Sequence, residues 1–194
     1  MNIIDFIKYY PEVLAGDICD QIVLELQNKL SESDRNVIDF LKIFMEPDDD
    51  NFICKYISES IRKTKEQYLN DHPKYAKSYH NVSGEKYGIR EDMSRKLIVQ
   101  YYPTGGGMDF HIDNTGIRRQ FMEKNKKILE WHLSQLSCIL FLNDNYGGGE
   151  FVIADQEYKP LKGSVIFFPS NFMFPHKVNT VKEGTRWTCG GWFR

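Results

Sequence analysis

The sequence lacks several features that would place it in a specialised class of protein. None of its four cysteines, Cys19, Cys54, Cys138 and Cys189, lies in a C-x-x-C pair, so neither a thiolate zinc site nor a thioredoxin-like motif is expected. No apolar run approaches the roughly 20 residues that a membrane-spanning helix needs. The N-terminus has Asp5 within its apolar stretch and no basic start, unlike a signal peptide. The sequence therefore predicts a soluble, cytoplasmic protein with reduced cysteines.

The chain also lacks an excess of charge of either sign. Its 194 residues include 25 Lys and Arg against 27 Asp and Glu, a net charge of −2. This balance gives no electrostatic footprint for nucleic acid or an anionic membrane surface. We therefore expect the partner to be a peptide, protein or small-molecule substrate, with no nucleic acid and no membrane. The sequence indicates no particular oligomeric state.

The N-terminal part of the chain favours helices. Apolar residues recur at helical spacing over 15–30 and again over about 50–69. A shorter helix is expected over 37–44. We interpret residues 1–90 as an extension that braces a core formed by residues 91–194, the two together making a single structural domain.

The rest of the chain is typical of a β protein. Short strand-like segments, separated by Gly, Pro and Asn, are expected at 97–102, 110–113, 137–142, 150–154, 164–168, 174–180 and 185–193. Such a series predicts two facing antiparallel sheets. The expected fold class is mainly β with N-terminal helices: a double-stranded β-helix (jelly roll, cupin-like) braced by helices.

The segment 114–132 interrupts this series. It is rich in basic residues, with apolar residues interspersed, and it is too long for a hairpin turn. Two interpretations remain open, a solvated helical insertion and a lid over the substrate.

Two histidines and one aspartate form the candidate metal site. His111 and Asp113 are two positions apart, so on a strand their side chains point to the same face. This H-x-D pattern is weak by itself because it is common by chance. His176 follows the apolar run 165–168 on a later strand-like segment. Two histidines and one carboxylate are the facial set that binds iron(II) and leaves positions open for a cosubstrate and oxygen.

Arg186 is the candidate anchor for an anionic ligand. The segment 182–184 is typical of a three-residue hairpin loop with glycine at the left-handed position. That loop would place Thr180 opposite Arg186, so that His176 and Arg186 both point into the barrel. A buried guanidinium suits a carboxylate. A dicarboxylate that chelates the metal at one end would meet Arg186 at the other.

Two more side chains share the strand face of Arg186. Thr188 and Trp192 follow it at even spacing. We expect the Thr188 hydroxyl to hydrogen-bond the carboxylate and the Trp192 indole to wall the pocket.

These motifs give the C-terminal half a resemblance to a known family. The segment from about residue 97 to 193 resembles the prolyl 4-hydroxylase-like branch of the 2-oxoglutarate/Fe(II) dioxygenases. The matching motifs, in the family's order, are Tyr102-x-x-Gly105, His111-x-Asp113, Leu140-Phe-Leu-Asn-Asp, Gly148-Gly-Glu150, Lys162-Gly-Ser-Val-Ile-Phe-Phe-Pro169, His176, Gly184-Thr-Arg186 and Trp192-Phe193.

The resemblance implies a role for each of five residues. His111, Asp113 and His176 are implied to hold Fe(II) as the catalytic centre. Arg186 is implied to bind the distal carboxylate of 2-oxoglutarate, assisted by the hydroxyl of Tyr102.

The same resemblance implies an activity. It is hydroxylation of an unactivated C–H bond with O2, releasing succinate and CO2, with ascorbate as a supporting reductant. The implied substrate is a prolyl residue of a peptide or protein. A free amino acid or other small molecule, and a catalytically silent binding module, remain alternatives. Halogenation is not expected because halogenating relatives lack the Asp113 carboxylate, and nucleobase repair is not expected because Trp192 replaces a second arginine.

The remaining motifs receive structural interpretations. The glycines at 105–107 lack the pattern of a phosphate-binding loop, and we expect a turn or bulge where the backbone approaches the substrate channel. His72, His80 and His132 have no partner at ligand spacing and are expected at the surface or at helix ends. Tyr101 should face away from the site that Tyr102 enters.

Overall fold

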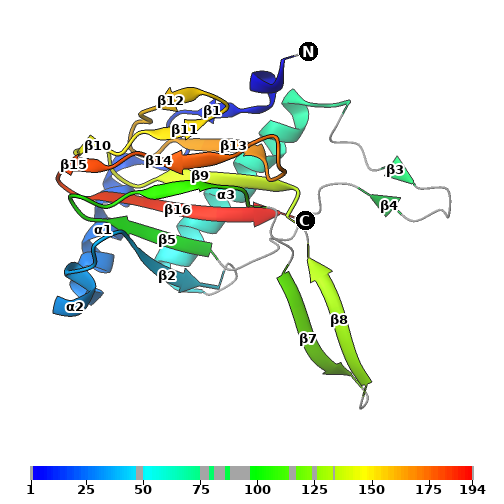
Figure 1. Cartoon of the computed structure of the whole chain (residues 1–194), viewed down its shortest axis with the longest axis horizontal. Coiled ribbons are helices and arrows are strands. Elements are labelled where there is room, and N and C mark those ends of the chain that lie inside the picture. The colour runs from blue at the N-terminus through cyan, green and yellow to red at the C-terminus, as the bar shows by residue number, and fades with distance from the viewer. Residues whose placement is uncertain are drawn as a thin grey trace.

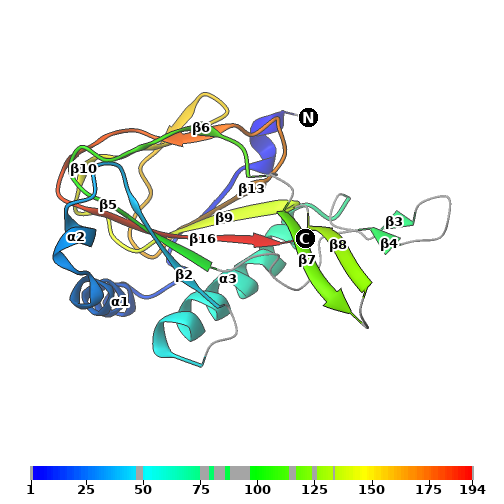
Figure 2. The same cartoon turned by 60° about the horizontal axis from the view of Figure 1, so that its bottom comes forward.

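Two antiparallel sheets face each other, and helices cover the outer face of the larger one (Figure 1 and Figure 2). The computed structural model describes residues 2–46, 50–74, 79–80, 86–87, 97–113, 117–123, 126–132 and 134–193. This arrangement is the double-stranded β-helix that the strand series predicts.

The larger sheet has six strands and includes two from the N-terminal part of the chain. Its order is β1 (Lys8–Tyr10), β13 (Val165–Pro169), β9 (Leu136–Phe141), β16 (Arg186–Phe193), β5 (Leu97–Tyr102) and β2 (Leu41–Met45). The smaller sheet has four strands, in the order β12 (Gln156–Tyr158), β11 (Phe151–Ile153), β14 (His176–Val178) and β6 (Met108–His111). A short pair, β10 (Gly147–Gly148) and β15 (Val181–Glu183), lies at one end of the barrel.

The described part of the chain has four helical elements, the 3-10 turn η1 (Ile3–Phe6), α1 (Gly16–Lys29), α2 (Glu32–Arg35) and α3 (Phe52–Asp71). Of these, α1 and α3 brace the larger sheet from outside. Figure 2 shows α1 and α3 beneath the six-stranded sheet, with β6 on the opposite side of the barrel. Asn51 caps α3, because its side-chain oxygen accepts a hydrogen bond from the amide of Cys54. Among the described residues, no helix combines the length and apolar character needed to cross a membrane.

Alternation along the strands divides the core into two clusters. Leu140, Phe167 and Trp187 face the helices, whereas their strand neighbours Phe141 and Phe168 face the barrel interior. All five side chains are fully buried, and each contributes about 1.5–3 kcal/mol by leaving water. The larger sheet is therefore buried on both faces, which fixes which of its side chains reach the interior.

The helix expected at 37–44 is wrong. The chain forms α2 earlier, where Ser31 and Asp34 make a capping box, and then strand β2. Leu41, Ile43 and Met45 pack against the core while Phe44 is exposed, which is the alternation of a strand. Antiparallel pairing of β2 with β5 favours a strand over a helix in this segment.

The helical interpretation of 114–132 is also wrong. This region forms an antiparallel hairpin of β7 (Ile117–Glu123) and β8 (Lys126–His132), which extends away from the barrel in both views. A smaller pair, β3 (Tyr79–His80) and β4 (Lys86–Tyr87), also lies outside the barrel. The interpretation of 114–132 as a substrate lid stays a prediction.

The hairpin expected at 182–184 does not form. β15 pairs with β10, and Arg186 on β16 lies opposite Tyr102 rather than Thr180. The chain crosses here from the smaller to the larger sheet, with Gly184 at φ +73° as the left-handed residue. The local pattern gave the turn residue correctly but could not identify the strand partners.

Candidate active site

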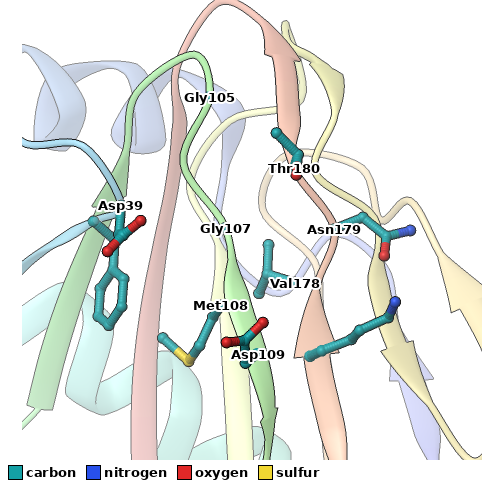
Figure 3. A pocket seen from close by; sticks show the side chains of 10 residues that line it. Asp39, Gly105, Gly107, Met108, Asp109, Val178, Asn179 and Thr180 are labelled. Atoms are coloured by element: carbon teal, nitrogen blue, oxygen red, sulfur yellow. The ribbon is translucent and has the colours of Figure 1, made fainter.

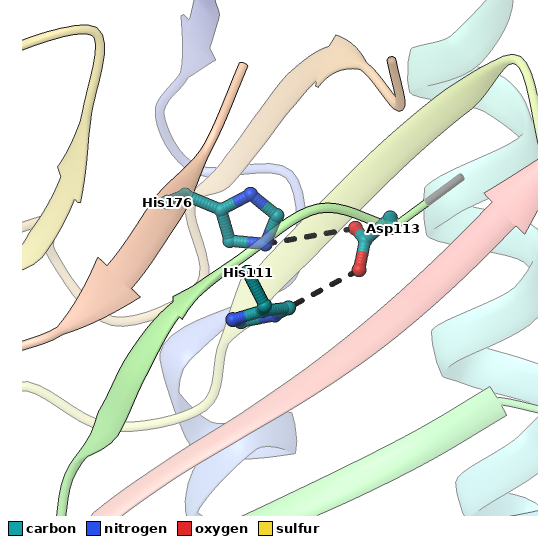
Figure 4. A group of neighbouring side chains, drawn as sticks. All are labelled: His111, Asp113 and His176. Atoms are coloured by element: carbon teal, nitrogen blue, oxygen red, sulfur yellow. Dashed lines mark ion pairs between the residues drawn. The ribbon is translucent and has the colours of Figure 1, made fainter. Parts of the chain in front are cut away.

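Three potential metal ligands meet inside the barrel. The ligand atoms of His111, Asp113 and His176 all lie within 4.8 Å of one another. The two Asp113 oxygens face the two imidazoles, at 3.8 Å from Nε2 of His111 and 3.7 Å from Nε2 of His176 (Figure 4). Asp113 and His176 are buried, and His111 is about a third exposed. Two imidazoles and one carboxylate are the donor types of a facial iron(II) set.

A β-bulge turns His111 toward the other two ligands. His176 pairs directly with His111 and Val178 with Met108, so Asp109 and Phe110 together oppose a single residue of β14. Asp109 and Phe110 are both exposed, whereas Met108 packs toward the barrel interior. Without the extra residue, regular alternation would send Met108 and His111 to opposite faces. The bulge lets both point inward.

Backbone carbonyls fix the orientation of both imidazoles. Nδ1 of His111 lies 2.9 Å from the carbonyl oxygen of Asp109, and Nδ1 of His176 lies 3.0 Å from that of Phe174. A carbonyl oxygen can only accept, so Nδ1 carries the proton in each ring. The lone pair is then on Nε2, which points toward Asp113. This is the tautomer that a metal ligand needs.

Burial also favours the metal-binding form of His176. It lowers the pKa of this imidazole, while the Asp113 carboxylate works in the opposite direction and the second imidazole adds to the lowering. His176 is therefore neutral at neutral pH and able to bind a cation through Nε2.

Arg186 lies on the facing sheet and is completely buried. Its guanidinium carbon is 4.9 Å from the ring centroid of Tyr102 and 5.3 Å from that of Phe141. Nη1 donates a 3.3 Å hydrogen bond to the hydroxyl of Thr188. Within the described part of the chain, no carboxylate comes within ion-pair distance of Arg186. A buried guanidinium in such surroundings is costly unless an anion joins it.

Donors around Arg186 have no acceptor among the described residues. Nε and Nη2 of Arg186 and the hydroxyls of Tyr102 and Tyr146 are buried without a hydrogen-bond partner. Burial raises the pKa of Tyr102 to about 12, against the opposing charge of Arg186, so this hydroxyl keeps its proton. The negative charge of Asp113 also raises the pKa of Tyr102, in the same direction as burial.

These features fit Fe(II) and 2-oxoglutarate. Two imidazoles and a carboxylate supply the donor set for the ferrous ion. The unpaired donors at Arg186, Tyr102 and Tyr146 match the acceptor capacity of a carboxylate.

The two other predicted site residues occupy different surroundings. Thr188 is fully buried beside Arg186, and its hydroxyl donates to the side-chain oxygen of Gln100 at 3.3 Å. Trp192 is buried farther along β16, where its indole folds back over Gly190: a Cβ on that glycine would lie 2.8 Å from the ring. A role for either residue in cosubstrate binding stays a prediction.

Three residues at this site were missed by sequence reasoning. Phe141 lies under the guanidinium, Tyr146 adds a second unpaired hydroxyl, and Gly149 makes the close approach possible. Phe141 and Gly149 lie within motifs that match the family, but those motifs did not indicate a contact with Arg186. Contacts to Arg186 come from segments distant in sequence, which a local pattern cannot show.

The glycines at 105–107 form a tight turn beside a separate polar pocket. Gly105 adopts φ +90°, and a Cβ on Gly106 would overlap the carbonyl of Asp39. The pocket has a volume of about 380 Å³ and includes Gly105, Gly107 and Lys177 in its lining (Figure 3). The expected turn is present, and its backbone packs closely on that of Asp39. Its expected position beside the substrate channel stays a prediction.

His72 and Tyr101 lie where the sequence predicts. His72 is the C-cap of α3, as expected for a helix end, and Tyr101 faces the helices, away from the site. The side chains of His80 and His132 lie outside the described part of the structure.

Comparisons with known proteins agree with this geometry. A family model described as the 2OG-Fe(II) oxygenase superfamily matches residues 97–194. A PKHD-type hydroxylase of Rippkaea orientalis is 37% identical over 102 residues, which are 50% of this chain and 41% of the relative. The chain therefore spans about two-fifths of the length of this curated relative.

Solved structures extend the likeness in fold to nearly the whole chain. The viral collagen prolyl hydroxylase of Paramecium bursaria Chlorella virus-1 superposes with a TM-score of 0.65 at 17% identity, covering 97% of this chain and 95% of that one. A prolyl hydroxylase of Trichoplax adhaerens superposes with a TM-score of 0.62 at 17% identity, covering 97% and 83%. This family uses Fe(II) as cofactor with 2-oxoglutarate and O2 as cosubstrates, and the His-Asp-His cluster fits the iron. The chain belongs to the 2OG-Fe(II) oxygenase superfamily.

Proposed function

We propose that this chain hydroxylates an unactivated C–H bond with Fe(II), 2-oxoglutarate and O2, releasing succinate and CO2. The observation that carries the proposal is the pairing of a His-Asp-His cluster with a buried arginine that has no described anionic partner. Bound iron supplies the activation of O2, at the expense of cosubstrate oxidation to succinate and CO2.

The side chains of the protein position the reactants and exclude water. His111, Asp113 and His176 hold the metal on one side of the barrel. Arg186 and Tyr102 hold the distal carboxylate on the other side, where a low dielectric strengthens the contact. Binding through both ends fixes the cosubstrate in one orientation, which makes the attack geometry reproducible. The Thr188 hydroxyl supports the orientation of the guanidinium.

For the substrate, we propose a prolyl residue of a peptide or protein. The solved Trichoplax adhaerens prolyl hydroxylase is in complex with a peptide fragment of a hypoxia-inducible factor degradation domain. A curated relative in Mus musculus, 28% identical over 150 residues, carries the name prolyl 3-hydroxylase 2. Both comparisons support a prolyl substrate over a free amino acid.

The first experiment tests the metal and cosubstrate. Anaerobic addition of Fe(II) and 2-oxoglutarate to the full chain should produce a weak visible charge-transfer band. Asp113→Ala should abolish the band, whereas Asp109→Ala should keep it because that exposed side chain faces away from the cluster. A band of full strength in Asp113→Ala would refute the ligand assignment.

The second experiment tests the substrate. Proline-containing peptides are incubated aerobically with the loaded enzyme, and succinate release is measured together with peptide mass. We expect a mass gain of one oxygen atom, localised to proline. Succinate release stimulated by amino acids but by no peptide would refute the peptide substrate, and a bound cosubstrate without any stimulated turnover would indicate a silent binding module.

A further inference from the structure

Tyr146 places a second unpaired hydroxyl beside the carboxylate anchor. It lies in the turn between β9 and β10 and is 6% exposed. Its hydroxyl is buried, and the proton of that hydroxyl has no acceptor among the described residues, since the neighbouring Arg186 guanidinium can only donate. Burying a hydroxyl donor without an acceptor is costly, so a group of this kind calls for a bound acceptor.

Glycines hold this ring against Arg186. Gly149 adopts φ +65°, and a Cβ there would lie 3.0 Å from Cε2 of Tyr146 and 3.2 Å from Cδ of Arg186. The two side chains therefore converge on the same glycine. On the other side, a Cβ on Gly184 would lie 3.6 Å from Cβ of Tyr146. The ring has little freedom to turn away from the guanidinium.

Arg186 also affects the protonation of Tyr146. Burial raises the pKa of the Tyr146 phenol, and the charge of Arg186 together with a hydrogen bond from its guanidinium opposes part of that rise. The net shift is upward, so the phenol keeps its proton at neutral pH. It is then a neutral donor next to a cation, an arrangement that an anion completes.

We propose that the Tyr146 hydroxyl donates a hydrogen bond to the distal carboxylate of 2-oxoglutarate, as a third binding residue beside Arg186 and Tyr102. This inference rests on the proposed function. An ionised carboxylate offers about four acceptor positions, and the guanidinium fork occupies two of them. The hydroxyls of Tyr102 and Tyr146 fill the remaining two.

This clamp selects for a dicarboxylate cosubstrate. A 2-oxo acid without the distal carboxylate would leave the guanidinium and both hydroxyls buried and unpaired. Sites built around hydrogen bonds reject such analogues strongly because the binding groups remain unsatisfied. Tyr146 is thus a specificity-determining residue in addition to a binding residue.

The test measures binding rather than turnover. The full chain is loaded with Mn(II), and 2-oxoglutarate and 2-oxopentanoate are each titrated by calorimetry. The second ligand keeps the metal-chelating end but lacks the distal carboxylate. Tyr146→Phe removes only the hydroxyl. Tyr101→Phe is the matched control, because Tyr101 is equally buried but packs on Trp187 on the helix side of the sheet.

Tyr146→Phe should weaken 2-oxoglutarate binding about ten- to a hundred-fold and leave 2-oxopentanoate binding unchanged. Tyr101→Phe should leave both unchanged. Wild-type affinity for 2-oxoglutarate in Tyr146→Phe, or an equal loss for both ligands, would overturn the inference while the proposed function stands. Failure of the wild-type protein to bind 2-oxoglutarate would overturn both.

Discussion

His176 and His111 lie directly opposite each other on the antiparallel strands β14 and β6, with their ring centroids 4.3 Å apart. This pairing makes the metal site depend on the register of two strands. A slip of one residue would turn one imidazole out of the barrel. Because His176 and Asp113 are also buried, the cluster is held by the same packing that holds the sheet.

Metal binding should stabilise the fold through this cluster. A divalent ion at about a hundred times its dissociation constant should add roughly 2.7 kcal/mol to the free energy of unfolding. We expect Mn(II) to raise the melting temperature of the wild-type protein, and a chelator to reverse the rise. In His176→Ala the rise should be absent, and a shift of wild-type size in that variant would contradict the assignment.

Arg186→Met should affect stability and binding in opposite directions. Methionine fills a similar volume without a buried charge, so the melting temperature without ligand should rise. Binding of 2-oxoglutarate should fall beyond detection because the charged anchor is gone. Thermal melting and calorimetry on one preparation check both effects. Retained 2-oxoglutarate binding would rule out Arg186 as the anchor.

Thr188→Val should have a milder effect than Arg186→Met. Valine is close to threonine in shape, but it removes the acceptor of the Nη1 hydrogen bond and the donor to Gln100. We expect 2-oxoglutarate affinity to fall about ten-fold, corresponding to roughly 1–1.5 kcal/mol. Titration of the variant with 2-oxoglutarate checks this value. Unchanged affinity would show that the guanidinium needs no support from Thr188.

Gly163→Ala should destabilise the protein more than Gly105→Ala. Both glycines have positive φ, which costs an alanine roughly 1–2 kcal/mol. A Cβ on Gly163 would also overlap the carbonyl of Leu14, whereas a Cβ on Gly105 would meet nothing within 4 Å. Urea unfolding of the two variants separates backbone strain from overlap. Equal destabilisation would show that the contact with Leu14 relaxes freely.

His72 should make stability depend on pH. Its ring stacks on Phe6 at 5.3 Å, and burial lowers its pKa below the usual 6.5, with Lys8 adding to the effect. Below pH 6.5 the unfolded chain binds a proton that the folded chain resists, so stability falls as pH falls. His72→Phe keeps the stacking but removes the titration. The stability of His72→Phe relative to wild type should therefore increase as the pH falls from about 7 to about 5, around the usual histidine pKa. A difference in stability that stays constant with pH would contradict this assignment.

The sequence alone determined the ligand types, the helices α1 and α3, and the barrel strands of the C-terminal half, but not β1, β2 or β12. Each of these is encoded locally: apolar spacing separates helix from strand, and glycine marks the turns. The H-x-D pair with a later histidine and arginine gave the chemistry of the candidate site. These inferences need no knowledge of which strands are neighbours.

The tertiary structure decided which strands became neighbours and what surrounds each side chain. It replaced the expected hairpin at 182–184 by a crossing between sheets, and it turned His111 inward through a bulge on β6. It also brought Tyr146 to Arg186 from a different segment of the chain. Strand pairing and burial depend on the summed packing of residues distant in sequence, so no local pattern contains them.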